Sequence, residues 1–206
     1  MSVSEERAVQ ATSAPVSGIA DPAPLGLAAF ATTTFLLSAA NANWMGAASG
    51  AAFLGYAFAY GGFIQLLAGM WEFRNRNVFG ATAFSTYGGF WIGIGLWALL
   101  VAPHDTALQA GHDKAWIVLA FAIVNTYLLI LSTQLNVAVF LVFLTLELTE
   151  IFLFIGGFAN STGLVKAGGY VGVLTAVVAW YTSAAGISNG MIGGKLRFPV
   201  GPPLIR

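Results

Sequence analysis

Two carboxylates interrupt an otherwise apolar stretch in the second half of the chain. Glu147 and Glu150 stand in the segment Leu-Thr-Leu-Glu-Leu-Thr-Glu, and side chains three residues apart share one face of a helix. A carboxylate inside a membrane is costly and usually functional, and a carboxyl group removed from water favours its neutral form. We therefore expect Glu150 or Glu147 to carry a proton or to form part of a gate. Alternatively, either one bonds to a polar group such as Asn125 or Asn136, or reaches a boundary between subunits.

Gln65 is a second candidate for polar chemistry. It shares one helical stripe with small residues and a carboxylate, namely Gly61, Gly62, Gly69 and Glu72. An amide among glycines points into a close-packed seam, where it bonds either to a substrate or to a neighbouring helix. Glu72 stands close to Arg74 and Arg76, and this spacing predicts an ion pair at the membrane edge.

Neutral hydroxyls and amides recur in other apolar stretches. Thr33, Thr34 and Asn125 join Gln65 as residues expected along a substrate path. Neutral donors suit a carboxylate in transit, because a transported ion must bind loosely enough to leave. No Lys or Arg is predicted deep in any span. This pattern argues against tight capture of a multivalent anion and favours a small monocarboxylate.

Two histidines, His104 and His112, share a predicted loop with Asp105 and Asp113. Histidine beside a carboxylate can bind a metal ion or sense pH. The predicted loop is exposed and offers no third strong ligand, and the chain has no cysteine. We therefore expect neither a metal site nor a cofactor.

Membrane helices must position these residues. The chain of 206 residues is 58% hydrophobic and 8% charged, whereas soluble domains are about 25% charged. So few charges cannot cover a globular surface in water, which indicates an integral membrane protein. The net charge is zero, which removes the electrostatic case for nucleic acid. The sequence contains no recognisable nucleophile–base pair and no phosphate-binding loop, so nothing in it points to an enzyme.

The uncharged stretches predict an all-α fold with six transmembrane helices, since a span needs about 20 apolar residues. Asp21 and Pro22 suit the first turn of the first helix. Breaks are expected where Asn, Gly and Thr gather, at 41–46 and 132–136. The expected spans are 23–42, 49–72, 79–102, 115–134, 137–158 and 166–190, with one longer connection at 103–114.

Two tails are expected to flank a transport domain at residues 21–194. Residues 1–20 form a flexible tail that lacks the pattern of a signal peptide, and residues 195–206 form a second tail. Lys and Arg concentrate on the cytoplasmic side of a membrane. The six-span topology places six of them on the side of the termini and two, Lys114 and Lys166, on the other. Both termini are therefore predicted to be cytoplasmic, in the plasma (inner) membrane.

Several motifs in the first half of the chain resemble the acetate transporter (AceTr, YaaH-type) family, which includes bacterial succinate–acetate/proton symporters. In order, the motifs are Pro22-Ala23-Pro24-Leu25-Gly26-Leu27 with Phe30 and Thr33-Thr34, Tyr60-Gly61-Gly62 with Gln65, Ala68-Gly69 and Glu72, Phe79-Gly80, and Thr82-Ala83-Phe84-Ser85-Thr86-Tyr87-Gly88 with Phe90-Trp91. The agreement is dense over residues 21–91 and looser beyond.

The resemblance implies a homohexamer in the lipid bilayer, with a separate substrate path through each protomer. It implies that the path is constricted by Phe30, Tyr87 and Leu146, and Thr82 joins the residues expected along it. Two aromatic rings and a Leu can close a narrow pore by excluding water. The chain departs from the family in two places. Asp21 replaces the usual Asn, and the fifth helix, which is apolar in the family, contains Glu147 and Glu150 in this chain.

The resulting expectation is transport of acetate and related small monocarboxylates. Proton symport and passive anion channelling both remain open, since a fixed negative charge on the path would repel acetate unless it is protonated or paired. The alternative is a hexameric channel for a small neutral solute such as urea.

Overall fold

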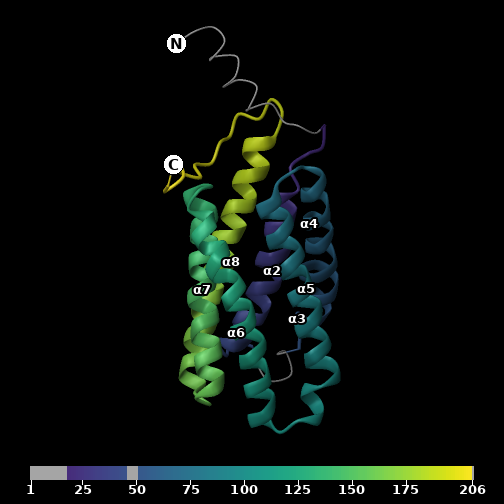
Figure 1. Ribbon diagram of the computed structural model, residues 1–206, viewed down its shortest axis with the longest axis vertical. Helices are drawn as coiled ribbons and strands as arrows, with labels where there is room; N and C mark the ends of the chain where they lie inside the picture. The colour runs from purple at the N-terminus through teal and green to yellow at the C-terminus, as the bar shows by residue number, and fades with distance from the viewer. Residues whose placement is uncertain (1–17, 46–50, 206) are drawn as a thin grey trace.

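The computed structural model describes residues 18–45 and 51–205, and every regular element within these ranges is a helix. Six helical segments are long and apolar enough to cross a membrane. They stand side by side, and the first begins at the same end of the molecule where the last one ends (Figure 1). The predicted all-α fold with six spans is confirmed. Most of the tail predicted at 1–20 lies outside the described residues.

The elements differ from the predicted spans mainly in the fourth one. They are α2 (Ala23–Asn41), α3 (Phe53–Phe58), the π-helix η2 (Ala59–Ile64), α4 (Gln65–Arg74), α5 (Val78–Leu100), the 3₁₀ turn η3 (Ala102–His104), α6 (Ala107–Ser132), α7 (Val137–Phe158) and α8 (Thr162–Gly190). The prediction of a longer connection at 103–114 was wrong, because α6 begins eight residues before the predicted start at 115. Thr106 accounts for this start, since its Oγ1 accepts a hydrogen bond of 3.2 Å from the Gln109 N–H.

Other helix starts follow the sequence signals. Asp21 Oδ1 accepts a hydrogen bond from the Ala23 N–H at 2.9 Å, which satisfies a donor in the first turn of α2. Asn77 and Asn136 cap α5 and α7 by accepting from Gly80 N and Val139 N, each at 3.0 Å. Side chains in the short turns therefore satisfy backbone donors at the starts of these helices and define where each helix begins.

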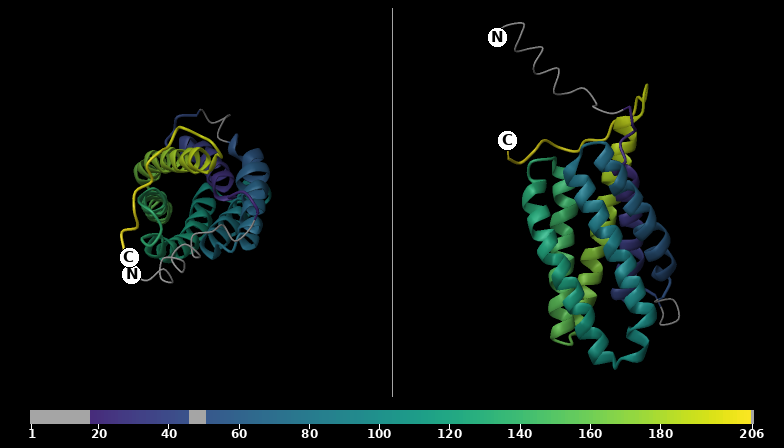
Figure 2. Two further views of the ribbon diagram at one scale, coloured as in Figure 1. Left: turned by 90° about the horizontal axis from the view of Figure 1, so that it is seen from above. Right: turned by 45° about the vertical axis from the view of Figure 1, so that its right-hand side comes forward.

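The spans form a ring when viewed along their axes (Figure 2, left). Its order is α2, α8, α7, α6, α5 and then the segment α3–η2–α4, which returns to α2. Small residues allow the closest approaches: a Cβ added to Gly61 in η2 would lie 2.6 Å from Thr33 Oγ1, and Gly169 in α8 faces the backbone of Ala42. The interior of the ring holds side chains from several helices, among them α2, α4, α5 and α7.

The chain after α8 lies across the end of the bundle that carries the termini (Figure 2, right). Tyr181 Oη donates to Pro199 O at 2.6 Å, and Ala138 N donates to Val200 O at 2.9 Å. Leu204 N then donates to Thr133 O at 2.8 Å. This C-terminal segment is thereby fastened to the turn between α6 and α7.

Candidate functional site

Two cavities inside the ring meet at three residues. The near cavity lies toward the end of the bundle where α2 begins and α8 ends, and has a volume of about 100 Å³. The far cavity, on the other side, has a volume of about 40 Å³. Among the described residues, the two linings share only Phe30, Tyr87 and Leu146. The residues that the family resemblance implies as a constriction therefore lie where the two cavities adjoin.

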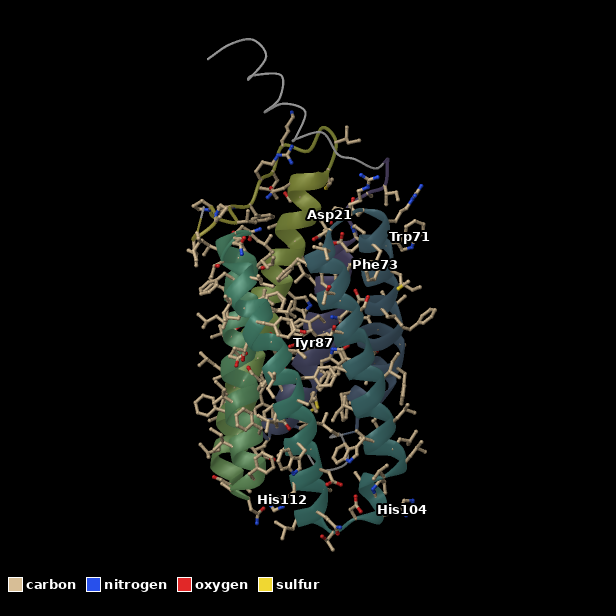
Figure 3. The ribbon with its side chains drawn as sticks, viewed as in Figure 1. Asp21, Trp71, Phe73, Tyr87, His104 and His112 are labelled. Atoms are coloured by element: carbon tan, nitrogen blue, oxygen red, sulfur yellow. The ribbon has the colours of Figure 1, made fainter. Side chains whose placement is uncertain are left out.

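These three side chains come from three different helices, α2, α5 and α7, and all are buried. The rings of Phe30 and Tyr87 meet edge to face, with centroids 5.7 Å apart and an interplanar angle of 68°. Tyr87 lies about midway between Asp21 at one end and His104 and His112 at the other (Figure 3). The contact between the cavities is therefore deep in the bundle and apolar except for one hydroxyl.

That hydroxyl belongs to a polar network. Tyr87 Oη lies 3.1 Å from Asn125 Oδ1 and 3.3 Å from Glu150 Oε1, and can donate to either. Asn125 is fully buried, and its Nδ2 donates to Phe143 O at 3.0 Å and to Glu147 Oε2 at 2.7 Å. Asn125 therefore orients Tyr87 rather than lining a cavity.

The two carboxylates of α7 occupy different surroundings. Glu150 is 5% exposed and lines the far cavity, and its Oε2 has no hydrogen-bond partner among the described residues. Glu147 is partly exposed and lines neither cavity, and both of its oxygens accept hydrogen bonds, from Asn125 and from Thr126 Oγ1 at 2.9 Å. The predicted alternative of a bond to Asn125 therefore holds for Glu147.

The near cavity contains the amide of Gln65, which is 1% exposed. Gln65 Oε1 has no hydrogen-bond partner in the part of the chain that the structure describes. Asn77 is the second polar residue at this cavity, and its Nδ2 donates to Glu72 Oε1 at 3.0 Å. The near cavity therefore presents neutral amides.

The predicted ion pair of Glu72 with Arg74 and Arg76 was wrong. Glu72 is fully buried, and its two oxygens accept hydrogen bonds from the amides of Asn75 and Asn77, each at 3.0 Å. Arg74 and Arg76 are exposed instead, at the point where α4 ends and the chain turns with a φ of 60° at Arg76. The two amides can reach a carboxylate facing the start of α5, which sequence spacing alone did not indicate.

The predicted path residues divide between the cavities and the helix seams. Thr34 lines the far cavity, and its Oγ1 has no partner among the described residues. Thr33 lines neither cavity and donates back to Ala29 O at 3.0 Å. Thr82 is likewise away from both, and donates to Val78 O at 2.8 Å.

Lys114 is a residue of the far cavity that sequence patterning placed in a loop. Its Nζ donates to Asn41 Oδ1 at 3.2 Å, and both residues line the far cavity. Lys114 thus lies in a helix and not in a loop, because α6 extends back to Ala107, and it lies level with Asn41, the last residue of α2. The Thr106 cap was the sequence signal that would have placed it.

The far cavity continues toward the far end of the bundle. A passage of about 200 Å³ shares Lys114, Val118 and Leu153 with the far cavity. A mouth of about 590 Å³ shares Gly111 and Gly157 with that passage, and is also lined by Lys166. Three adjoining hollows therefore lead from the constriction to the far end.

His104 and His112 do not converge on a metal site. They belong to η3 and α6, and the described residues contain no group of three or more His, Cys, Asp or Glu able to hold a metal ion. Both residues lie at the far end of the bundle (Figure 3).

Known proteins match the chain over most of its length. A sequence profile described as the GPR1/FUN34/yaaH family matches residues 5–192. Acetate permease A of Emericella nidulans is 41% identical over 188 residues, which cover 82% of this chain and 62% of that protein. Ammonia transport outward protein 2 of Saccharomyces cerevisiae is 38% identical over 181 residues, covering 85% of this chain and 64% of the relative. The chain thus spans less than two thirds of the length of these fungal proteins.

Bacterial proteins of similar length also match. The succinate-acetate/proton symporter SatP of Escherichia coli is 32% identical over 186 residues, which cover 89% of this chain and 96% of that protein. The solved structure of the bacterial acetate channel SatP superposes with a TM-score of 0.81 at 26% identity, covering 89% of this chain and 99% of that chain. Together with its six membrane-capable helices, these matches make the chain a multi-pass membrane protein that belongs to the GPR1/FUN34/yaaH family.

Proposed function

We propose that this protein is a transporter, not an enzyme, and that it moves acetate and related small monocarboxylates, with succinate as a second substrate. The path runs through each protomer. The observation that carries the proposal is the pair of cavities that adjoin only at Phe30, Tyr87 and Leu146. Relatives named acetate permease and succinate-acetate/proton symporter support the substrate class.

The constriction suits a small carboxylate physically. Two aromatic rings and a Leu disfavour water, so the closed path holds back hydrated ions. A methyl group tolerates these apolar walls, while the Tyr87 hydroxyl offers a hydrogen bond to the carboxylate. A short acid with one apolar end and one charged end therefore fits this constriction better than an inorganic ion.

Proton coupling is assigned to Glu150. A phenol has one proton, so Tyr87 cannot donate to Asn125 and to Glu150 at once. Both contacts become hydrogen bonds when Tyr87 donates to Asn125 and a protonated Glu150 donates to the phenol oxygen. A neutral Glu150 also removes the charge that would repel acetate. Glu150 is thus the proton carrier in the proposed symport, and Glu147 is not.

The assembly and orientation are proposed on further grounds. The family resemblance supports a homohexamer in the lipid bilayer of the plasma (inner) membrane. Arg74, Arg76, Lys195 and Arg197 belong to the end with the termini, which supports cytoplasmic termini. The far cavity would then face outward.

A neutral solute is the second candidate. The carboxyl of Glu150 on the path would not repel urea or ammonia, and one relative is named for outward ammonia transport. Against this candidate, Lys114 on the same path favours an anion.

Radiolabelled acetate uptake into proteoliposomes tests the proposal, with and without an inward proton gradient. Accumulation above equilibrium that collapses with a protonophore is the expected result. Flux that only equilibrates would replace symport by channelling. Urea or ammonia flux without acetate flux would overturn the carboxylate proposal in favour of the neutral solute.

A further inference from the structure

Lys114 is the only Lys or Arg among the described residues that line the far cavity, and it also lines the passage that leads outward from it. Its side chain enters between α2 and α6, where the ammonium donates to Asn41 Oδ1 at 3.2 Å. Asn41 is its one hydrogen-bond partner among the described residues, and Asn41 Nδ2 itself has none. An ammonium has three protons, so Lys114 keeps donors for a further acceptor.

The far cavity has unsatisfied polar atoms at its deep end as well. The atoms are Thr34 Oγ1, Trp91 Nε1 and Glu150 Oε2, and all three residues are at least nine-tenths buried. Buried polar atoms in folded proteins nearly always have partners, so several orphans around one cavity indicate that a polar molecule belongs there. Around the far cavity, donors outnumber acceptors, since the donors include a hydroxyl, an indole, an amide and an ammonium. The molecule that belongs there should therefore supply acceptor oxygens.

The two ends of this cavity are separated along α2. Phe30 and Asn41 both line it, and eleven residues of helix correspond to about 16 Å. Lys114 and Asn41 therefore meet a solute before it arrives at Tyr87. The described residues that line the near cavity include no Lys or Arg. Because the cation lies on only one side of the constriction, an anion that enters from the far end should be bound more tightly than one that enters from the near end.

We propose that Lys114 and Asn41 form an anion station, which binds the carboxylate of the transported acid in the far half of the path. The station takes one monocarboxylate, because it offers one cation. This inference deepens the proposed function and rests on it for the identity of the acid. It adds that acetate has a higher apparent affinity from the far end than from the near end.

Acetate flux from each end, in vesicles sorted by protein orientation, tests the station through a charge-removing variant. Lys114→Met should raise the half-saturating acetate concentration from the far end about tenfold, since a hydrogen bond to a charged group is lost. The value from the near end should change less than about twofold. Lys114→Arg should stay close to the parent, because it keeps the charge.

Two matched variants separate the station from a general effect of positive charge. Asn41→Asp keeps Lys114 but gives its ammonium a carboxylate partner within the protein. It should therefore raise the half-saturating acetate concentration from the far end, as Lys114→Met does. Lys166→Met removes a cation from the far mouth but leaves the ammonium of Lys114 in place, so it should raise the half-saturating acetate concentration from the far end less than Lys114→Met does. Equal effects of Lys114→Met and Lys166→Met, or an unchanged far-end value in Lys114→Met, would overturn the station.

Acetate binding to the detergent-solubilised protein separates this inference from the proposed function. Acetate should raise the melting temperature of the parent but not of Lys114→Met, with chloride as the reference anion. If the parent binds acetate through Lys114 but carries no flux, the station stands and the transport proposal falls. If it carries acetate but Lys114→Met shows the parent's melting shift, the station falls alone.

Discussion

The near and far cavities meet at the same three residues, yet their linings differ. The near cavity is the larger, and its polar groups are the neutral amides of Gln65 and Asn77. The far cavity is smaller, and its described lining includes Lys114 and Glu150. In the proposed mechanism, the carboxylate is therefore recognised, and the proton exchanged, on one side of the constriction, while the other side offers only neutral polar groups.

A second contrast, within one helix turn, explains how that difference arises. Glu147 and Glu150 are three residues apart, but of the two only Glu150 lines the far cavity. Asn125 donates to Glu147 and can accept from Tyr87, so one buried amide links Glu147 to a residue that lines both cavities. Two neighbouring carboxylates thus have different surroundings, which is why the proposed symport uses only Glu150.

The largest effect is expected from removing the ionisable group of the far cavity. Glu150→Gln keeps the shape of the side chain but cannot release a proton, so acetate accumulation should fall from above equilibrium to equilibrium. Proteoliposome uptake under a proton gradient measures this. Glu147→Gln is the matched control and should keep accumulation within about twofold of the parent, because Gln retains an acceptor oxygen for Asn125 and the proposed symport takes no proton from Glu147. Equal loss in both variants would erase the contrast between the two carboxylates.

Widening the constriction should let larger monocarboxylates pass from one cavity to the other. Leu146→Ala removes apolar volume beside Phe30 and Tyr87, so four-carbon monocarboxylates should gain about tenfold in flux relative to acetate, since each methylene in an apolar pocket is worth about 1–3 kcal/mol. Competition of butyrate with labelled acetate measures the ratio. Leu141→Ala, on the exposed side of the same helix, is the control and should leave it unchanged. A ratio that does not move in Leu146→Ala would mean that another residue limits passage.

Removing the hydroxyl at the constriction should have a smaller effect. Tyr87→Phe keeps the ring against Phe30 but leaves Asn125 Oδ1 without a hydrogen-bond donor. A buried acceptor left unpaired costs about 1–3 kcal/mol, which predicts a lower melting temperature and a several-fold lower acetate flux. Thermal unfolding in detergent and initial uptake rates test both parts. Selectivity between acetate and butyrate should stay the same, in contrast to Leu146→Ala.

Composition and the spacing of apolar stretches were enough to predict the fold. Six spans were predicted because charges and turn residues separate them, and Asp21 accepts a hydrogen bond from the first turn of α2, the place where the sequence suggested it. The start of α6 was not predicted, because a charged and polar first turn such as Gln109 to Lys114 reads as a loop until the Thr106 cap is recognised. That error concealed the cation of the far cavity.

The candidate site was less predictable than the fold. Apolar residues such as Phe30 and Leu146 carry no signal of their own within apolar helices, and only the family resemblance singled them out. The separation of Glu147 from Glu150 depends on Asn125, which is distant in sequence, and the partners of Glu72 depend on the turn after α4. Such contacts between elements follow from packing, which helical spacing within one element does not encode.

The smallest effect is expected at the near cavity. Gln65→Leu removes the amide there, and since Gln65 Oε1 already lacks a partner among the described residues, stability should change little. If the near cavity only weakly holds the carboxylate, half-saturation from the near end should rise about two- to threefold, as expected for one neutral hydrogen bond. The far-end value should not move, in contrast to Lys114→Met. Flux measured from both ends of the same sorted vesicles gives the comparison. A tenfold effect from the near end would mean that recognition is shared between the two cavities, and the asymmetry of the path would have to be abandoned.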